Sequence, residues 1–313
     1  MRIAMLGAGA MGSLFGGLLA EAGEDVTLID VNDAHLDAIR RDGLRIENDR
    51  GERRITTLRA VRPDAAQRAR GEPFDLLIVF TKSLHTRAAL DGVRALLTAH
   101  TAVLTLQNGL GNVETLNAFV PIEQILVGVT TWPADLAGPG HVRSHGVGAI
   151  RMMTADGAAR PFAQAVADAL SRAGLACALD ADVWAAIWEK VAFNAALNTL
   201  CAVTGCTVDQ LGACHEGPRL ALAIAAETAA VATAKGIAVD AVRIARNVEH
   251  AIGEHRGHRG HRPSMLQDVL AGRRTEIGAI NGAVVAAARE AGVAVPHTET
   301  LLGLVRLIDA RHA

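Results

Sequence analysis

A glycine-rich segment near the start of the chain constrains its fold more than any other feature. Gly7-Ala8-Gly9-Ala10-Met11-Gly12 follows a short buried strand, Arg2–Leu6, and opens a helix. Glycines at this spacing allow a tight turn, a close approach of the backbone to a diphosphate, and close packing of helix on strand. The amides at the helix start then face the anion, and the helix dipole favours its charge. The segment therefore predicts a dinucleotide-binding unit, with cofactor contacts at Gly7, Ala8, Gly9, Ala10, Met11 and Gly12.

Two hydrophobic patterns divide the chain. The first half alternates short aliphatic strands with helices, which is typical of a parallel, doubly wound sheet. From about Asp182 onward almost every segment has helical periodicity. We therefore predict an α/β protein, with an N-terminal Rossmann-type doubly wound sheet in residues 1–178 and a C-terminal all-helical domain in residues 179–313. The expected strands are Arg2–Leu6, Asp25–Ile29, Leu44–Glu47, Arg54–Leu58, Leu76–Phe80, Ala102–Leu106, Gln124–Val129 and Val142–Met152. The expected helices are Met11–Ala22, Asn32–Asp42, Leu84–Leu97, Asn112–Phe119, Ala158–Ala173, Asp182–Val203, Pro218–Lys235, Asp240–Glu254, Ser264–Ala271, Thr275–Ala291 and His297–Arg311.

The composition excludes several classes of protein. The net charge is −2 and no long run of one sign occurs, which argues against a nucleic-acid partner and an anionic membrane surface. No segment is typical of a targeting signal or a membrane span. The four cysteines lack metal-ligand spacing and indicate reduced thiols, so a cytoplasmic location is expected. The chain has no tyrosine, which excludes a mechanism with a catalytic Tyr. The Ala-rich helices are compatible with a homodimer.

Asp30 ends the second expected strand, about 20 residues after the glycines. An acidic side chain at this position accepts hydrogen bonds from the adenosine ribose hydroxyls and repels a 2′-phosphate. The residues that follow are Val31, Asn32 and Asp33, with no arginine among them. The pattern favours NADH over NADPH. The alternative is that Asp30 caps the next helix, a role that Asn32 or Asp33 could equally fill.

Two polar segments follow the fourth and fifth strands of the Rossmann pattern, at the carboxyl ends where such sheets bind ligands. Lys82 lies in Thr81-Lys82-Ser83, and is either a cofactor contact or an ordinary solvated lysine. Asn108 lies in Gln107-Asn108-Gly109. It either contacts the ribose or nicotinamide side of the cofactor or forms an Asx turn.

The segment Trp188–Asn198 carries a polar stripe on an apolar helix. Lys190, Asn194 and Asn198 are four residues apart, so they lie on one face. When hydride reaches a ketone carbon, negative charge develops on the oxygen, and a positioned ammonium stabilises that charge and donates a proton. The amides can hold oxygen atoms without adding charge. The alternative is a polar seam between packed helices.

A second cluster of polar residues, His255–Arg262, alternates His and Arg with glycines. We expect no metal site there, because the glycines indicate a loop and the spacing specifies no ligand geometry. The segment is either solvated or a basic approach to Ser264 that attracts an anionic substrate.

In this order and spacing, the motifs resemble the ketopantoate reductase (2-dehydropantoate 2-reductase) family over essentially the whole chain. The resemblance rests on the glycine fingerprint and on four further segments: Gln107-Asn108-Gly109, Trp188–Asn198, Ser264–Asp268 and Arg274–Gly282. The family fold is a Rossmann domain followed by a helical domain. The implied reaction is the NAD(P)H-dependent reduction of the 2-oxo acid ketopantoate to pantoate, on the way to pantothenate and coenzyme A.

The resemblance also implies roles on the substrate side. Lys190 is the proton donor to the ketone oxygen, and Asn194 and Asn198 hold the substrate from the same helix. Ser264 binds the carboxylate side of the substrate. Glu276 lies beside the cofactor and the substrate hydroxyl, where it either orients Lys190 or binds a hydroxyl. It is also favourable simply as an acid at a helix start.

On the cofactor side, the resemblance implies contacts from Asn108, Lys82 and Ala134, the last being the weakest match. Asn108 also contacts the substrate. The chain departs from the family at Asp30-Val31, where members that use NADPH commonly carry a basic residue. It also lacks a further substrate-contacting Asn near Cys206.

Two other functions fit the same motifs. One is a reductase of another 2-oxo acid. The other is a catalytically silent dinucleotide-binding sensor, which would be expected to lose the proton donor, whereas Lys190 is retained.

Overall fold

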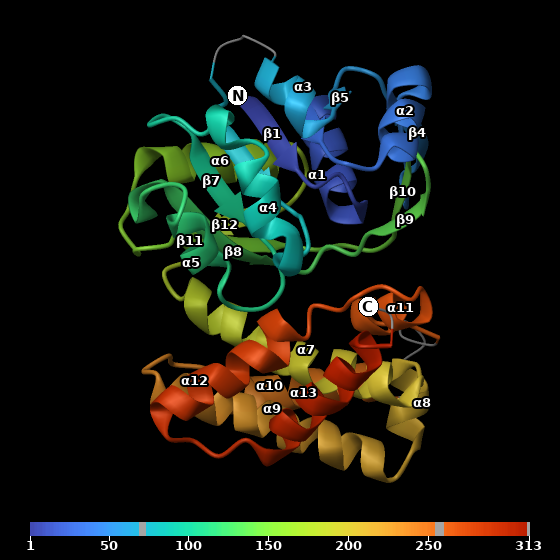
Figure 1. Cartoon of the computed structure of the whole chain (residues 1–313), viewed down its shortest axis with the longest axis vertical. Coiled ribbons are helices and arrows are strands. Elements are labelled where there is room, and N and C mark those ends of the chain that lie inside the picture. Colours follow the sequence, from blue (N-terminus) through green and yellow to red (C-terminus); the bar gives the residue numbers. More distant parts are fainter. Residues whose placement is uncertain (69–72, 254–259, 312–313) are drawn as a thin grey trace. The chain divides into compact units, whose positions relative to one another are not determined.

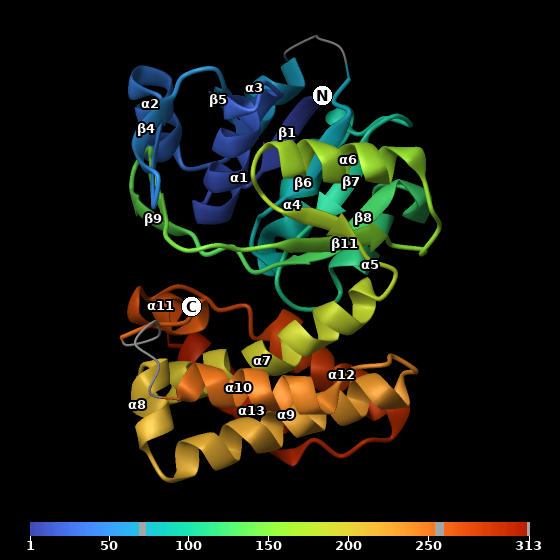
Figure 2. The same ribbon diagram turned by 180° about the vertical axis from the view of Figure 1, so that it is seen from behind.

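The computed structural model describes residues 1–68, 73–253 and 260–311, which form two compact units (Figures 1 and 2). The first unit comprises Met1–Gln107 and Asn112–Val183. The second comprises Trp184–Ala313 together with a short segment from within the Rossmann pattern, Asn108–Gly111.

The first unit contains two sheets. The larger has eight strands in the order β12-β11-β8-β7-β6-β1-β2-β5, and its neighbours are parallel except for β8 and β11. The smaller has the order β4-β3-β10-β9, in which only β3 and β10 are parallel. The strands are β1 (Arg2–Leu6), β2 (Asp25–Ile29), β3 (Leu44–Asn48), β4 (Gly51–Ile55), β5 (Arg59–Val61), β6 (Leu76–Val79), β7 (Ala102–Thr105), β8 (Ile125–Thr130), β9 (Asp135–Gly138), β10 (His141–Ser144), β11 (Ile150–Thr154) and β12 (Cys177–Leu179).

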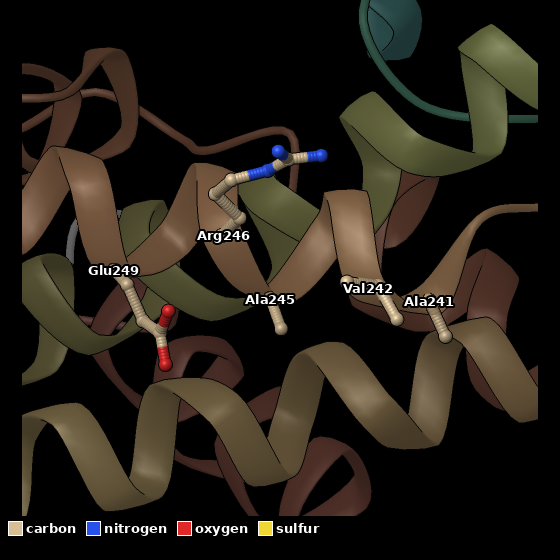
Figure 3. A pocket seen from close by; sticks show the side chains of 5 residues that line it. All are labelled: Ala241, Val242, Ala245, Arg246 and Glu249. Atoms are coloured by element: carbon tan, nitrogen blue, oxygen red, sulfur yellow. The ribbon is translucent and has the colours of Figure 1, made fainter.

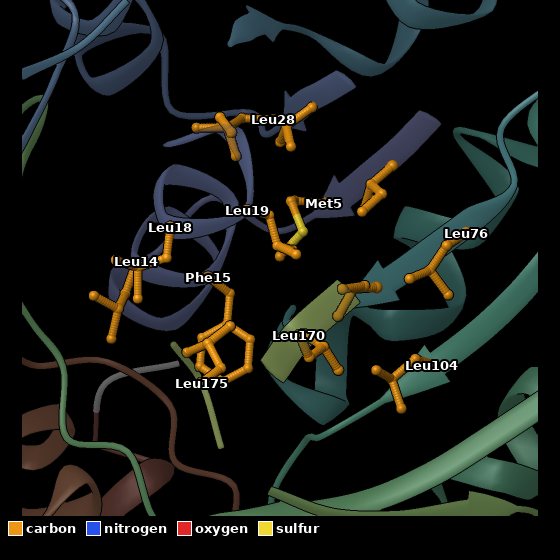
Figure 4. Packing of buried hydrophobic residues seen from close by; sticks show 14 of the residues in the cluster. Met5, Leu14, Phe15, Leu18, Leu19, Leu28, Leu76, Leu104, Leu170 and Leu175 are labelled. Carbon is orange, nitrogen blue, oxygen red and sulfur yellow. The ribbon is translucent and has the colours of Figure 1, made fainter. Parts of the chain in front are cut away.

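Helices cover the larger sheet on both faces. The apolar sides of α1 and α6 share one core with β1, β2, β6 and β7, in which Phe15 and Leu170 meet Met5 and Leu104 (Figure 4). Strands buried on both faces need continuous aliphatic sequence, as in Leu76–Val79. The helices of this unit are α1 (Ala10–Glu21), α2 (Asp33–Asp42), α3 (Pro63–Arg68), α4 (Thr86–Asp91), α5 (Asn112–Asn117) and α6 (Pro161–Arg172), with 3₁₀ turns η1 (Ser83–His85), η2 (Arg94–Leu96) and η3 (Ile122–Gln124).

Two consecutive glycines fit α1 between the two sheets. A Cβ on Gly16 would lie 2.5 Å from a methyl of Leu28 in the larger sheet. A Cβ on Gly17 would lie 2.5 Å from a methyl of Ile46 in the smaller sheet. Since protein interiors are close-packed, a side chain at either position would require Leu28 or Ile46 to shift. The helix that follows the fingerprint is therefore held on two sides.

The second unit is helical, and α7 is its most buried helix. Residues Asn194–Ala202 of α7 are all buried, which is expected of a helix that is apolar on most sides. α9 and α10 lie side by side in both views of the fold (Figures 1 and 2). The helices are α7 (Val183–Thr204), α8 (Val208–Ala213), α9 (Glu216–Ala234), α10 (Ala241–Ile252), α11 (Ser264–Leu270), α12 (Ala283–Ala291) and α13 (Pro296–Asp309), and a π-helical turn, η5 (Gly278–Gly282), precedes α12.

The predicted fold class, a Rossmann-type sheet followed by helices, is confirmed. Several element bounds were wrong. The segment expected as one helix over Leu84–Leu97 is broken at Gly92, which ends α4. The strand expected over Val142–Met152 is two strands in different sheets, β10 and β11. The helix expected from Thr275 begins instead with the π-helical turn η5. Within the described residues, no helix is long and apolar enough to cross a membrane.

Candidate active site

The glycine loop between β1 and α1 has the geometry that its sequence predicts. Gly7 has φ +96°, and a Cβ there would lie 2.7 Å from the amide nitrogen of Thr81. A Cβ on Gly12 would overlap the carbonyl oxygen of Gly7, so this glycine is needed for helix and loop to pack. A Cβ on Gly9 would meet nothing within 4 Å. Gly9 is exposed and caps α1, so the open space beside it lies where the helix amides accept an anion. This cradle fits the diphosphate of a dinucleotide.

Asp30 braces the glycine loop from the end of β2. One carboxylate oxygen accepts a hydrogen bond from the Ala8 amide at 2.6 Å. The other accepts from the amides of Val31 at 2.7 Å and Asn32 at 2.9 Å. The side chain of Asn32, and not that of Asp30, caps α2 by accepting from the His35 amide at 3.2 Å. The capping alternative for Asp30 is thus assigned to Asn32, and Asp30 stays partly exposed beside the loop.

The residues directly after Asp30 in the sequence include no arginine, but folding places Arg62 beside them. Arg62 follows β5, which pairs with β2, and its guanidinium donates to the Val31 carbonyl at 3.1 Å. The same group bonds the Asp33 carboxylate at 2.7 Å, and this carboxylate raises the pKa of Arg62. Arg62 therefore lies beside the residues that follow Asp30 and is ion-paired with Asp33.

A buried histidine ties the glycine loop to the smaller sheet. Nδ1 of His35 accepts from the Gly140 amide at 3.0 Å, so Nε2 carries the ring proton and donates to the Ser13 hydroxyl at 3.0 Å. Ser13 in turn donates to the Ala8 carbonyl at 2.8 Å. Burial lowers the pKa of His35, against the opposing effect of Asp30, so the neutral ring that this chain of bonds requires is favoured.

The other residues of the first unit that were predicted to contact the cofactor lie in loops after strands. Lys82 follows β6, and its carbonyl accepts from the His85 amide at 2.8 Å. The side chain of Gln107 donates to the Thr81 carbonyl at 2.5 Å and to the Thr86 hydroxyl at 2.7 Å, so it fastens this loop to the end of β7. Ala134, between β8 and β9, packs against the core of the unit.

In the second unit, α7 presents Lys190, Asn194 and Asn198 in successive turns. Lys190 is partly buried, and both asparagines are buried, at 7% and 6% exposed. Burial lowers the pKa of the Lys190 ammonium to about 8, while the nearby carboxylate of Glu276 favours the charged form. Lys190 is therefore still charged at neutral pH but gives up its proton far more readily than an exposed lysine.

Two further elements converge on α7. Asn198 donates to the Ser264 hydroxyl at 3.5 Å, which places the start of α11 beside the polar stripe. Glu276 lies between Thr275 and η5, and Thr275 is held by two hydrogen bonds to Asp309 of α13, at 3.1 and 2.9 Å.

The loop that carries Asn108 belongs to the same unit. Gly109 has φ +86°, and a Cβ there would lie 2.8 Å from the Ala279 carbonyl carbon. The Leu110 amide donates to the Ala279 carbonyl oxygen at 2.8 Å. Of the predicted site residues, the second unit thus brings together Asn108, Lys190, Asn194, Asn198, Ser264 and Glu276. The first unit brings together the glycine loop and Asp30.

Other features lie apart from these residues. A shallow depression on α10 is lined by Ala241, Val242, Ala245, Arg246 and Glu249 (Figure 3). None of these residues belongs to an element of the predicted site. Over the described parts of the chain, no cluster of three or more His, Cys, Asp or Glu is arranged to hold a metal ion. Most of the basic segment His255–Arg262 lies outside the described residues, which resume at Gly260.

A glycine cradle in the first unit and a lysine–asparagine stripe on a buried helix in the second are features expected of an oxidoreductase that uses a nicotinamide dinucleotide. The profile described as "Ketopantoate reductase PanE/ApbA" matches residues 3–157, and its C-terminal counterpart matches residues 182–309. A 2-dehydropantoate 2-reductase from Halobacterium salinarum is 36% identical, with 98% of each chain covered. Another from Streptococcus pyogenes serotype M3 is 33% identical, with 99% of this chain and 98% of the relative covered. The structure of a D-mandelate dehydrogenase with NADH and anilino(oxo)acetate has a TM-score of 0.92 and 32% identity, covering 100% and 99% of the two chains. The chain belongs to the ketopantoate reductase family.

Sequence reasoning missed several residues that support these positions. Arg62 is far from Asp30 in sequence, and only the pairing of β5 with β2 reveals it. Asn281 is fully buried and bonds α7, but in sequence it is one polar residue in an Ala-rich helix pattern. Asn281 lies five residues after Glu276, away from its helical face, so no periodicity in the sequence marked it.

Proposed function

We propose that this protein reduces the ketone of 2-dehydropantoate to the alcohol of pantoate. The relatives from H. salinarum and S. pyogenes, which match almost the whole chain, support this substrate. The observation that carries the chemistry is Lys190, a lysine on a buried helix whose pKa is lowered to about 8 beside Glu276.

The residues of the second unit would complete the reduction at the carbonyl oxygen. Bound NAD(P)H would supply the hydride to the carbonyl carbon. As negative charge develops on the oxygen, the Lys190 ammonium stabilises it and then donates a proton, which gives the alcohol and a neutral amine. Asn194 and Asn198 donate amide hydrogen bonds to substrate oxygens, and Ser264 binds on the carboxylate side. Glu276 keeps Lys190 charged, because its carboxylate raises the pKa that burial lowers.

We assign cofactor binding to residues 1–178 and substrate binding and catalysis to residues 179–313. The support for the first assignment is the glycine cradle, including Ala8, Ala10 and Met11, and its brace from Asp30. Lys82 and Ala134 would contact the cofactor from loops that follow strands. Asn108 and Glu276 would contact it from the second unit.

We also propose that NADH is preferred over NADPH. The carboxylate of Asp30 is fixed by three backbone amides, so it cannot easily turn away from a 2′-phosphate. Arg62, the cation beside it, is bonded to Asp33 at 2.7 Å. A 2′-phosphate would therefore meet a fixed negative charge and a cation that is already paired.

Binding of the two cofactors tests this preference. The Kd for NADH should be at least about tenfold lower than the Kd for NADPH, which corresponds to about 1.4 kcal/mol. Asp33→Asn removes the nearer of the two carboxylates that pair with Arg62, the other being Asp64 at 3.9 Å, and should tighten NADPH binding about tenfold while NADH binding stays within about twofold. Asp37→Asn, which removes an exposed carboxylate that pairs with Arg40 on the same helix, is the matched control and should change neither. Equal affinities in the wild type would contradict the proposal.

Steady-state reduction of 2-oxo acids tests the substrate. A second candidate is an aromatic 2-oxo acid, favoured by the TM-score of 0.92 to D-mandelate dehydrogenase. Ketopantoate and phenylglyoxylate should be compared by kcat/KM with each cofactor. Higher kcat/KM for phenylglyoxylate would replace the first candidate by the second. No turnover of any 2-oxo acid, with normal NADH binding, would favour a catalytically silent sensor. Lys190→Ala should lower kcat by at least about 100-fold without changing the Kd for NADH.

A cytoplasmic homodimer is also our proposal. All four cysteines are free thiols, which supports a reducing compartment. Val242, Leu270 and Leu307, on α10, α11 and α13, are large apolar side chains exposed at 74%, 60% and 65%, and we propose that the partner subunit covers them. Light scattering of the purified protein would decide between monomer and dimer.

A further inference from the structure

The π-helical turn η5 connects three parts of the second unit that carry proposed catalytic groups. It begins two residues after Glu276 and directly precedes α12. In this turn the Gly282 amide donates to the Ile277 carbonyl at 2.9 Å, five residues back. The Ala283 amide donates to Ile280, whereas in an α-helix it would donate to Ala279. The Ala279 carbonyl is thereby available to the Leu110 amide, which it binds at 2.8 Å. The turn thus holds the Asn108 loop.

The same turn is fastened to α7 by two buried side chains. The amide nitrogen of Asn281 donates to the Ala195 carbonyl at 3.2 Å. The amide oxygen of Asn281 accepts from the Thr199 hydroxyl at 2.9 Å. Asn281 and Thr199 are both 0% exposed.

We call these two hydrogen bonds the clip. They fit the amide group of Asn281 in only one orientation. A flipped amide would place its oxygen against the Ala195 carbonyl, where both atoms only accept hydrogen bonds. The Thr199 hydroxyl lies 2.7 Å from the Ala195 carbonyl and 2.9 Å from Asn281, and its single proton can serve only one at a time. Ala195 is one residue from Asn194 and five from Lys190, so the clip fixes the stretch of α7 that carries the polar stripe.

We propose that Asn281 and Thr199 are positioning residues for the reduction: by fastening the π-helical turn to α7, they set Glu276 and the Asn108 loop in register with Lys190. The proposal rests on the roles assigned above to Lys190, Glu276 and Asn108. Neither Asn281 nor Thr199 needs to touch substrate or cofactor for this role. Their effect passes through the distance between Glu276 and Lys190.

Substitution of Thr199 separates positioning from general stability. Thr199→Val removes the hydroxyl with little change of shape and leaves the Asn281 oxygen without its donor. Thr199→Ser keeps the hydroxyl and is the conservative rescue. Thr204→Val is the control on the same helix, because the Thr204 hydroxyl lies 2.7 Å from the carbonyl of Leu200, four residues earlier, as Thr199 lies 2.7 Å from that of Ala195, but Thr204 lies outside the clip.

Two readouts are needed, kcat with KM, and the pKa of Lys190. The chain has three lysines, so NMR of protein labelled with ¹³C-lysine follows Lys190 without any substrate. We expect Thr199→Val to lower kcat about 10- to 100-fold, because small misplacements of reacting groups cost that much. KM should change less than about threefold. The pKa of Lys190 should fall as Glu276 recedes, Thr199→Ser should restore both values, and Thr204→Val should change neither.

The possible outcomes distinguish failure of the positioning role from failure of the proposed function. If kcat and the Lys190 pKa of Thr199→Val match those of Thr204→Val, the positioning role is wrong. If kcat falls in Thr199→Val while the Lys190 pKa stays unchanged, the clip is merely structural and the proposal is also wrong. If the wild type reduces no 2-oxo acid, the proposed function fails, yet the NMR titration still reports whether the clip holds Glu276 near Lys190. Asn281→Ala, which removes both hydrogen bonds of the clip without adding a charge, should repeat the effect of Thr199→Val on the Lys190 pKa.

Discussion

The protonation of Lys190 gives the sharpest test of the site. Burial lowers its pKa from 10.5 to about 8, which corresponds to about 3 kcal/mol against the ammonium in the folded protein. In protein labelled with ¹³C-lysine, one resonance should therefore titrate near pH 8. Lys82→Arg and Lys235→Arg assign the other two resonances, since these are the remaining lysines of the chain.

Glu276→Gln is the informative perturbation. The carboxylate raises the pKa of Lys190, so its removal should lower that pKa further, by about one unit. Reduction needs the ammonium, so kcat/KM should be full below the pKa and fall as pH rises through it. In a plot of kcat/KM against pH, the descending limb lies near pH 8 in the wild type and should thus move to lower pH in the variant. The reverse oxidation needs the neutral amine and should show the opposite slope.

A neighbouring carboxylate provides the control. Glu189 precedes Lys190 on α7, but its side chain is bound by Arg243, with Nε at 2.9 Å. Glu189→Gln should therefore leave the pH at which kcat/KM falls unchanged, even if it lowers the stability of the protein. A Lys190 resonance that titrates above about pH 10, or a limb that does not move in Glu276→Gln, would refute the reasoning.

Three further perturbations follow from the same geometry. Gly9→Ala should weaken NADH binding with no change in Tm, because its Cβ points into open space, whereas Gly12→Ala should lower both, because its Cβ overlaps the Gly7 carbonyl; calorimetry and NADH titration measure the two effects. Lys190→Met should be more stable than the wild type at pH 7, by up to about 3 kcal/mol in urea unfolding. This difference in stability should shrink between pH 8 and 10.5, as the folded wild type loses its buried charge, and a difference that is independent of pH would contradict this cause. Gly109→Ala should lower both Tm and kcat/KM, since the Cβ collides with the Ala279 carbonyl, whereas Gly111→Ala, with φ +84° and open space around its Cβ, should cost less of each.

Local patterns predicted the parts of this molecule that depend on neighbours in sequence. The fingerprint glycines act on one another and on adjacent strands, as the overlap of a Gly12 Cβ with Gly7 shows. The stripe of Lys190, Asn194 and Asn198 needs only helical spacing, and it falls on one continuous helix, α7. Aliphatic runs such as Leu76–Val79 identified the central strands.

Long-range pairing accounts for what was missed. β5 and β12 have only three residues each and gain their stability from strands far away in sequence, so no local period marks them. Arg62 reaches Val31 only through β5. The π-helical turn η5 has the composition of an α-helix, and its irregularity is compensated by the Leu110 amide, a partner more than a hundred residues earlier.

The assignment of Asn108–Gly111 to the helical unit limits how this protein can be dissected. A single cut near Val183 would yield a C-terminal fragment without the Leu110 amide, and the Ala279 carbonyl would lose its partner. The N-terminal fragment would keep a four-residue loop whose contacts are gone. Domain exchange between members of this family would accordingly succeed best when the donor of the helices also donates this loop, so that two separated stretches of gene are transplanted together.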